Sequence, residues 1–147
     1  MIVVATLEEA SLISQEQRVE PILVTGEGAI NIITALASVP RDTPIHNIGY
    51  AGSNLIPRGT RCRVGRVRCY HPEAKIQEKE FALDGDIDCY TSGDFVTATD
   101  LKVPCVFDME IAYILALGFT NVTSEKIVSD NLQKLDYEQV LRGEKVI

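Results

Sequence analysis

Three acidic positions in this chain stand where a side chain could transfer a proton. The dipeptide Ser129-Asp130 follows an apolar stretch, Met109-Glu110 follows another, and Glu8-Glu9 comes shortly after the first. A carboxyl group kept neutral near pH 7 by burial can act as a general acid, and an ionised carboxylate can act as a general base. Each position also has a structural interpretation, because Asp130 could cap the last helix and Glu110 could complement a helix dipole.

The elements that would position these side chains can be read from the apolar pattern. Short apolar runs predict strands, and apolar residues at helical spacing predict helices, as on the face formed by Ile30, Ile33 and Leu36. The predicted strands span 2–5, 22–24, 45–48, 60–70, 88–91, 103–107 and 123–128, and the predicted helices span 29–37, 109–117 and 132–141. Residues 72–88 are polar and acidic, and we expect an irregular segment or an edge hairpin there.

Strands that alternate with helices predict an α/β fold with a mainly parallel central sheet flanked by helices on both faces, in three layers. Ligands of such sheets bind beyond the carboxyl ends of the strands. The turns that follow residues 24 and 48, the turn 92–94 and the dipeptide 129–130 all lie at predicted strand ends. We therefore expect the functional site at that edge.

Length and charge restrict the classes of function. The 147 residues suit a single domain, 1–147, and 46% hydrophobic residues allow a substantial core. A net charge of −7 disfavours nucleic acid and anionic membrane surfaces as partners. A local arginine-rich stretch, 58–68, alternates with apolar residues, as on a half-exposed strand; this interpretation is favoured over an anion-binding patch.

The cysteines and histidines do not predict a metal site or a disulfide framework. Cys62, Cys69, Cys89 and Cys105 show no CxxC spacing, and His71 near Cys69 does not complete a set of three or four zinc ligands. Neither a signal peptide nor a membrane-spanning run is seen. We expect a cytoplasmic protein without a metal or organic cofactor.

The turn Gly26-Glu27-Gly28-Ala29-Ile30-Asn31 opens a helix and has a GxGxxN pattern that could hold a phosphate. Asn31 replaces the last small residue of the dinucleotide fingerprint, and no acidic residue ends a strand near position 50 to bind a ribose. A simple tight turn is the favoured interpretation.

Taken together and in order, the turn segments resemble those of the purine nucleoside phosphorylase and methylthioadenosine/S-adenosylhomocysteine nucleosidase superfamily. The matching segments are 4–9, 25–31, 47–52, 91–96, 108–110 and 129–130. The resemblance is greatest to the nucleosidase branch, and the chain looks like a shortened member of it. In relatives a hairpin lies where only about a dozen residues separate the first helix from the second strand here.

The resemblance implies a site for the purine. Asp130, paired with Ser129, would donate a proton to purine N7, which would make the base a better leaving group. Phe95 would stack on the purine and Val96 would offer backbone groups to its edge, although an aromatic residue after a strand is more often plain core. Ala51-Gly52 would complete the substrate-binding residues of this part.

The resemblance also implies a site for the sugar and the attacking water. Glu110 would accept hydrogen bonds from ribose hydroxyls, and Met109 would lie against the sugar. Glu9 would activate the water, with Glu8 as the alternative because the alignment is ambiguous by one residue. Thr25 would help to hold the water. Lys126 stands where nucleosidases usually carry arginine, and its point charge differs from a planar guanidinium fork.

The function implied is hydrolysis of the N-glycosidic bond of a purine nucleoside similar to 5′-methylthioadenosine or S-adenosylhomocysteine. Phosphorolysis is the alternative reaction; it is disfavoured because His46-Asn47, and not an arginine, precedes the Gly-rich segment 49–52. A nucleoside-binding module without turnover is the alternative class. The resemblance also implies a homodimer or higher oligomer.

Overall fold

A computed structural model describes residues 1–14, 16–71 and 75–143. The strands are β1 (Ile2–Val4), β2 (Ile22–Val24), β3 (Ile45–Ser53), β4 (Arg61–His71), β5 (Lys75–Ala82), β6 (Ile87–Thr91), β7 (Cys105–Asp108) and β8 (Val122–Asp130). The helices are α1 (Leu7–Ala10), the 3₁₀ turn η1 (Gln17–Val19), α2 (Ala29–Leu36), α3 (Ile111–Ala116) and α4 (Lys134–Leu141). The α/β class is confirmed, and so is the edge hairpin within 72–88, which β5 forms with β4; residues 72–74 lie outside the described residues.

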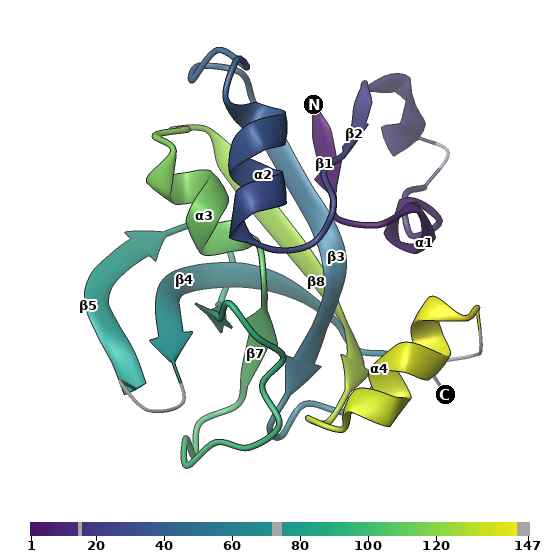
Figure 1. Ribbon diagram of the computed structural model, residues 1–147, viewed down its shortest axis with the longest axis vertical. Helices are drawn as coiled ribbons and strands as arrows, with labels where there is room; N and C mark the ends of the chain where they lie inside the picture. Colours follow the sequence, from purple (N-terminus) through teal and green to yellow (C-terminus); the bar gives the residue numbers. More distant parts are fainter. Residues whose placement is uncertain (15, 72–74, 144–147) are drawn as a thin grey trace.

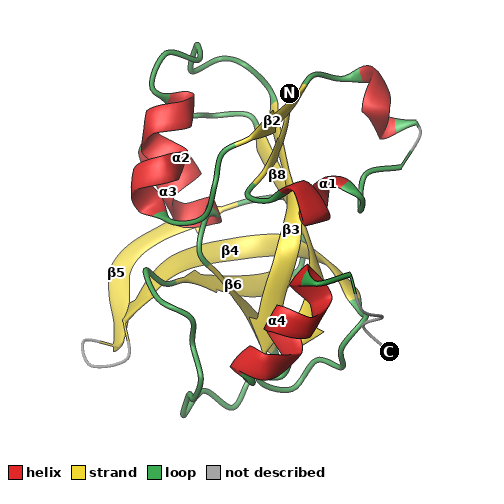
Figure 2. Ribbon diagram, turned by 45° about the vertical axis from the view of Figure 1, so that its right-hand side comes forward, coloured by secondary structure: helices red, strands yellow, loops and turns green. Residues whose placement is uncertain are grey.

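The prediction of a mainly parallel sheet is wrong, because the sheet is mixed. The sheet contains two groups of strands that are parallel within each group. One group consists of β1, β2, β3 and β8, and the other consists of β4, β6 and β7. The two groups meet through antiparallel pairs, β3 with β7 and β4 with β8. The strands β3, β7, β6, β4 and β8 therefore close on one another in a barrel-like ring, and in Figure 2 β4 runs across the direction of β3.

The helices lie on two sides of the long strands β3 and β8. Helices α2 and α3 lie together on one side, and α1 and α4 lie on the other (Figures 1 and 2). Within the described part of the chain, no helix is long and apolar enough to cross a membrane.

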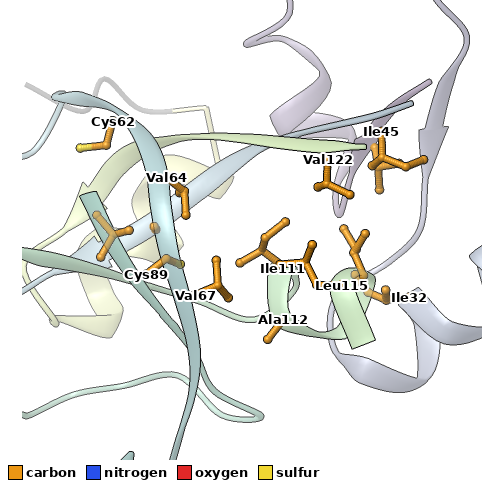
Figure 3. Packing of buried hydrophobic residues seen from close by; sticks show 14 of the residues in the cluster. Ile32, Ile45, Cys62, Val64, Val67, Cys89, Ile111, Ala112, Leu115 and Val122 are labelled. Carbon is orange, nitrogen blue, oxygen red and sulfur yellow. The ribbon is translucent and has the colours of Figure 1, made fainter. Parts of the chain in front are cut away.

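The main core lies between the strands and the pair α2 and α3. Figure 3 shows Val64 and Val67 of β4 facing Ile111 and Leu115 of α3, and all four side chains are buried. Burial of each such side chain stabilises the fold by about 1.5–3 kcal/mol. This core holds the strand ends of the site in place.

The helix predicted over 29–37 is present as α2, but of its apolar residues Ile30, Ile33 and Leu36 only Leu36 is buried. Ile30 and Ile33 are 81% and 45% exposed, whereas Ile32 and Leu36 are fully buried. Residues four apart lie on the same side of a helix, so the Ile32–Leu36 pair forms the core-facing stripe. The apolar content of this helix did not distinguish the two faces.

The arginine-rich strand is half-exposed, as predicted. Its exposed arginines are paired with carboxylates: Arg61 with Glu125, Arg63 with Asp84, Arg66 with Asp88, and Arg68 with Glu80. The positive charge of this strand face is therefore balanced by neighbouring carboxylates.

The predicted turn at Gly49–Gly52 is also wrong, since these residues continue β3. Gly52 pairs with Phe107 of β7 on one side and with Asp130 of β8 on the other. Thr91, at the end of β6, pairs with Asp108, at the end of β7. The ends of β6, β7 and β8 thus meet near the carboxyl end of β3.

Candidate active site

A cavity that is partly open to solvent lies where these strand ends meet. Five parts of the chain contribute its walls: β3, the loop after β6, the junction of β7 and α3, the end of β8, and α4. The residues that line it are Tyr50, Ala51, Gly52, Asp94, Phe95, Val96, Phe107, Asp108, Met109, Glu110, Ser129, Asp130 and Tyr137. Asp130 and Glu110, predicted from distant parts of the sequence, thus share one cavity.

Asp130 is fully buried at the end of β8. The Ser129 hydroxyl donates to its Oδ2 at 2.8 Å, and the Leu132 N–H donates to its Oδ1 at 2.9 Å. Burial raises the pKa of Asp130, and the hydrogen bond from Ser129 opposes part of that effect. The N-cap of α4 is Gln133, so Asp130 does not cap this helix.

The glycine at position 52 makes room for the Asp130 carboxylate. A Cβ atom added to Gly52 would lie 2.8 Å from Asp130 Oδ1. Gly49 likewise makes room for the carboxylate of Glu9 on α1, because a Cβ atom added to Gly49 would lie 2.6 Å from Glu9 Oε2. The Gly-rich segment of β3 therefore lets two carboxylates approach the backbone.

Glu110 also lines the cavity and belongs to a buried charge cluster. The Lys126 ammonium, fully buried on β8, lies 3.3 Å from Glu110 Oε2 and 3.1 Å from Asp108 Oδ2. Asp108 also accepts hydrogen bonds from the Thr91 hydroxyl and from the Ile111 N–H at the start of α3. One buried cation is thus shared by two carboxylates.

The two carboxylates of this cluster differ in protonation. Burial raises the pKa of Glu110 to about 8; Lys126 lowers it and Asp108 raises it further. Burial would also raise the pKa of Asp108, but Lys126 and its hydrogen bonds hold that pKa below the usual value. Burial would lower the pKa of Lys126, and the carboxylates around it raise it above its usual value. Asp108 and Lys126 are therefore the ionised pair, and Glu110 takes up a proton easily.

Glu9 is buried, whereas Glu8 is exposed. Glu9 Oε1 accepts from the N–H groups of Ala5 and Thr6, and Oε2 accepts from the Tyr50 N–H at 2.7 Å. Burial raises the pKa of Glu9, and Lys126 lowers it. Glu9 is thus linked to the charge cluster and, through Tyr50, to the cavity, but it does not itself line the cavity.

The structure brings most of the predicted site residues together and leaves some apart. Phe95, Val96 and Met109 line the cavity, as do Ala51, Gly52 and Ser129. Thr25 does not line it; the Thr25 hydroxyl donates to the carbonyls of Gly26 and Val4. Lys126 does not line the cavity itself but contacts Asp108 and Glu110, which do.

Other cavity residues were not predicted from the sequence. Tyr50 lines the cavity and donates its N–H to Glu9, and Tyr137 of α4 lies against Phe95 with ring centroids 5.3 Å apart. The Tyr137 hydroxyl donates to Glu27 Oε1 at 2.9 Å. Asp108 directly precedes Met109, a predicted site residue, so its position in the sequence could have indicated that it also lies at the site. Tyr137 gave no such signal, because only the packing of α4 brings it to the site.

Solved structures of other proteins show the same arrangement of elements. The nucleosidase MTAN of Chlamydia trachomatis superposes with a TM-score of 0.73 at 14% identity, covering 99% of this chain and 88% of that one. The chain has the nucleosidase fold.

Two further structures share this nucleosidase fold. The 5′-methylthioadenosine/S-adenosylhomocysteine nucleosidase of Neisseria meningitidis, in complex with methylthio-immucillin-A, gives a TM-score of 0.70 at 15% identity and covers 96% of this chain and 90% of that one. Futalosine hydrolase of Helicobacter pylori gives a TM-score of 0.71 at 13% identity, and the match covers 97% of this chain and 90% of that one. No protein-family model matches the chain, and no curated protein matches it.

Proposed function

We propose that this chain hydrolyses the N-glycosidic bond of a purine nucleoside similar to 5′-methylthioadenosine or S-adenosylhomocysteine. Asp130 donates a proton to purine N7 as the C1′–N9 bond breaks, and the electron pair of that bond passes to the base. Water adds to C1′ and gives its proton to Glu9. The products are the free base and the free sugar.

One observation carries this proposal: Asp130 and Glu110, which come from different elements, line the same cavity. An acid at the base and a hydrogen-bond acceptor at the sugar must face one ligand for the reaction to occur. The raised pKa of Asp130 supports its role as an acid, because its neutral form is then populated at higher pH. The solved nucleosidases with bound nucleoside analogues support the class of ligand.

The remaining roles are proposed for residues in the cavity and for two, Lys126 and Thr25, that lie outside it. Phe95 stacks on the purine, Val96 offers backbone groups to its edge, and Met109 lies against the sugar. Ala51 and Gly52 form the wall of β3 beside Asp130. Lys126 acts through Glu110, and Thr25, at the end of β2, helps to hold the water.

The charge of the cavity favours water over phosphate as the nucleophile. No lysine, arginine or histidine is among the residues that line it, within the part of the chain that the structure describes, whereas four carboxylates are: Asp94, Asp108, Glu110 and Asp130. A phosphate ion would enter this cavity without a cation to bind it. Hydrolysis is therefore preferred to phosphorolysis.

Base release from a panel of purine nucleosides, followed by chromatography with and without inorganic phosphate, tests the proposal. We expect free base in both conditions, at rates that phosphate leaves unchanged. Strict dependence on phosphate would overturn the hydrolytic reaction.

A nucleoside-binding module without turnover is the second candidate. The observation that favours it is the environment of Glu9, whose carboxylate accepts three backbone hydrogen bonds and does not line the cavity. Tight binding of a purine nucleoside with no released base would support this candidate.

We also propose that the chain forms a homodimer or higher oligomer in the cytoplasm. The exposed Ile30 and Ile33 of α2 offer apolar surface that a second copy could cover. Cys62, Cys69, Cys89 and Cys105 are all free thiols, which suits a reducing compartment. Light scattering on the purified chain measures the oligomeric state, and a monomer would contradict the proposal.

A further inference from the structure

The carboxylate of Glu110 has one oxygen bound to the protein and one that a ligand can reach. The Lys126 ammonium donates to its Oε2 at 3.3 Å, and the Met109 N–H donates to the same atom at 3.4 Å. Within the part of the chain that the structure describes, Oε1 takes part in no hydrogen bond, and no fully buried side-chain oxygen lacks a partner. Because Glu110 lines the cavity, Oε1 is open to it.

The buried charge cluster around Glu110 holds more carboxylates than cations. Asp108 and Glu110 both contact Lys126, at 3.1 Å and 3.3 Å. Glu9 also lies near this cation, because a Cβ atom added to Gly49 would lie 2.6 Å from Glu9 Oε2 and 3.4 Å from Lys126 Nζ. Among the described residues, Lys126 is the one cation that forms an ion pair with any of these three carboxylates. A buried carboxylate without a full counter-charge takes up a proton.

Hydrogen bonds decide which carboxylate of this cluster holds the proton. Glu9 accepts three backbone N–H groups at 2.7–3.0 Å. Asp108 accepts from the Thr91 hydroxyl at 2.5 Å and from the Ile111 N–H at 2.8 Å. Both sets of donors stabilise the ionised form. Glu110 has only the two longer contacts at Oε2, so it is the neutral member of the cluster when no ligand is bound.

The pKa of Glu110 agrees with this assignment. Burial raises it to about 8; Lys126 lowers it, and Asp108 and Glu9 raise it further. The other titratable groups around Glu110 are Cys89 of β6, Tyr113 of α3, Tyr137 of α4, Asp94 in the loop after β6, and Asp130 at the end of β8. Burial raises the pKa of the thiol and of both phenols, so these three groups stay neutral in the interval where Glu110 titrates.

We infer that binding of a purine nucleoside expels a proton from Glu110. The inference rests on the proposed function, which places the ribose at this carboxylate. Ribose hydroxyls donate to Oε1, and hydrogen bonds donated to a carboxylate stabilise its ionised form. The proton passes to solvent through the partly open cavity, and the carboxylate that remains is paired with Lys126. Ligand affinity then increases with pH until Glu110 is also ionised in the absence of ligand.

Isothermal titration calorimetry with 7-deazaadenosine measures this proton. Carbon replaces N7 in the ligand, so Asp130 has no atom to protonate and the glycosidic bond persists during the titration. Titrations at pH 7 in two buffers with different enthalpies of ionisation give the number of protons released. We expect about one proton per bound ligand, and an affinity that rises by at most about tenfold per pH unit and levels off above the Glu110 pKa of about 8.

Three variants assign the proton to a residue. Glutamine cannot release a proton, so in Glu110→Gln proton release should disappear and the affinity should no longer change with pH. Asp108→Asn leaves Lys126 to Glu110 alone, so Glu110 should be ionised before the ligand binds and the release should fall to roughly half or less. The matched control is Glu16→Gln, which removes an exposed carboxylate and should release the same proton as wild type.

The outcomes separate the inference from the proposed function. Binding to the wild-type chain without release of a proton would overturn the inference and leave the proposed function in place. Release of the same number of protons by Glu110→Gln would overturn the assignment to Glu110 and indicate Asp94 or Asp130, which every variant retains. No binding of 7-deazaadenosine would contradict the proposed function, and the inference with it.

Discussion

The Lys126 ammonium lies 3.3 Å from Glu110 Oε2, and both side chains are buried: Lys126 is 0% exposed and Glu110 is 6% exposed. Asp108 shares the same cation, so within the part of the chain that the structure describes Lys126 is the one cation paired with these two buried carboxylates. The charge state of Glu110 therefore depends on a residue that the cavity does not contain. Mutations in this cluster should change both stability and ligand binding.

Replacing Lys126 with methionine should destabilise the fold. Removal of one partner of a buried ion pair leaves the other charge uncompensated, which typically costs about 3–5 kcal/mol. Urea unfolding measures the loss, with Lys134→Met, at an exposed position, as the matched control. A Lys126→Met variant as stable as the control would contradict the role of Lys126 as a buried counter-charge.

Replacing Glu110 with glutamine should change how stability depends on pH. The pKa of Glu110 is about 8 in the folded chain and 4.5 in its ordinary state, so the folded chain holds this proton more tightly. The resulting stability is present below pH 4.5 and is lost as the pH rises through 8. Glutamine cannot lose a proton, so the melting temperature of Glu110→Gln relative to wild type should rise between pH 5.5 and pH 8.5.

Subtracting the stability of wild type from that of Glu110→Gln at each pH removes the contribution of the titratable groups that the two proteins share. We expect it to reach the order of a few kcal/mol in unfolding free energy at the alkaline end. A difference that stays constant with pH would show that Glu110 does not titrate in this interval.

Replacing Asp130 with asparagine should slow base release by on the order of a hundredfold or more, as for loss of a general acid. The amide keeps the shape of the side chain, so nucleoside affinity should change much less than the rate. Single-turnover assays and binding measurements separate the two effects. Turnover at the wild-type rate would remove Asp130 from the mechanism.

Replacing Glu9 with glutamine should reduce base release by about 10²–10⁴-fold, the usual contribution of a general base. Glu8→Gln provides the matched control, since Glu8 is the adjacent residue and is exposed. The capping hydrogen bonds of Glu9 can be kept in part by the glutamine oxygen, so folding should be preserved. Equal rates of base release in the two variants would remove Glu9 from the mechanism.

Replacing Gly52 with alanine should displace the Asp130 carboxylate. The added Cβ would lie 2.8 Å from Asp130 Oδ1 and 3.2 Å from Leu132 Cδ2, so the end of β8 must shift. Overpacking of this kind costs about 1–3 kcal/mol. Thermal unfolding checks this against Gly93→Ala, where the nearest atom would be 3.7 Å away. Equal melting temperatures would mean that the end of β8 accommodates the methyl group.

The mixed sheet could not be predicted because strand direction is set by partners far apart in sequence. The apolar runs at 45–48 and 103–107 were recognised, but the pattern of each run is the same whether its neighbour is parallel or antiparallel. The antiparallel pairing of β3 with β7 is decided by which backbone groups meet in the closed ring. The same limit applies to Gly49–Gly52, which has the composition of a turn but lies within a strand.

The amino-acid sequence by itself determined the α/β class, the order of the elements and the acidic residues at their ends. Those properties depend on local propensity and on the spacing of apolar residues, and both are determined by residues close together in the sequence. Tertiary structure alone decided that Glu9, and not Glu8, is buried, that Lys126 is paired with Glu110, and that Tyr137 reaches Glu27. These relations join residues many positions apart, and only packing in three dimensions sets the burial and distances on which their charges depend.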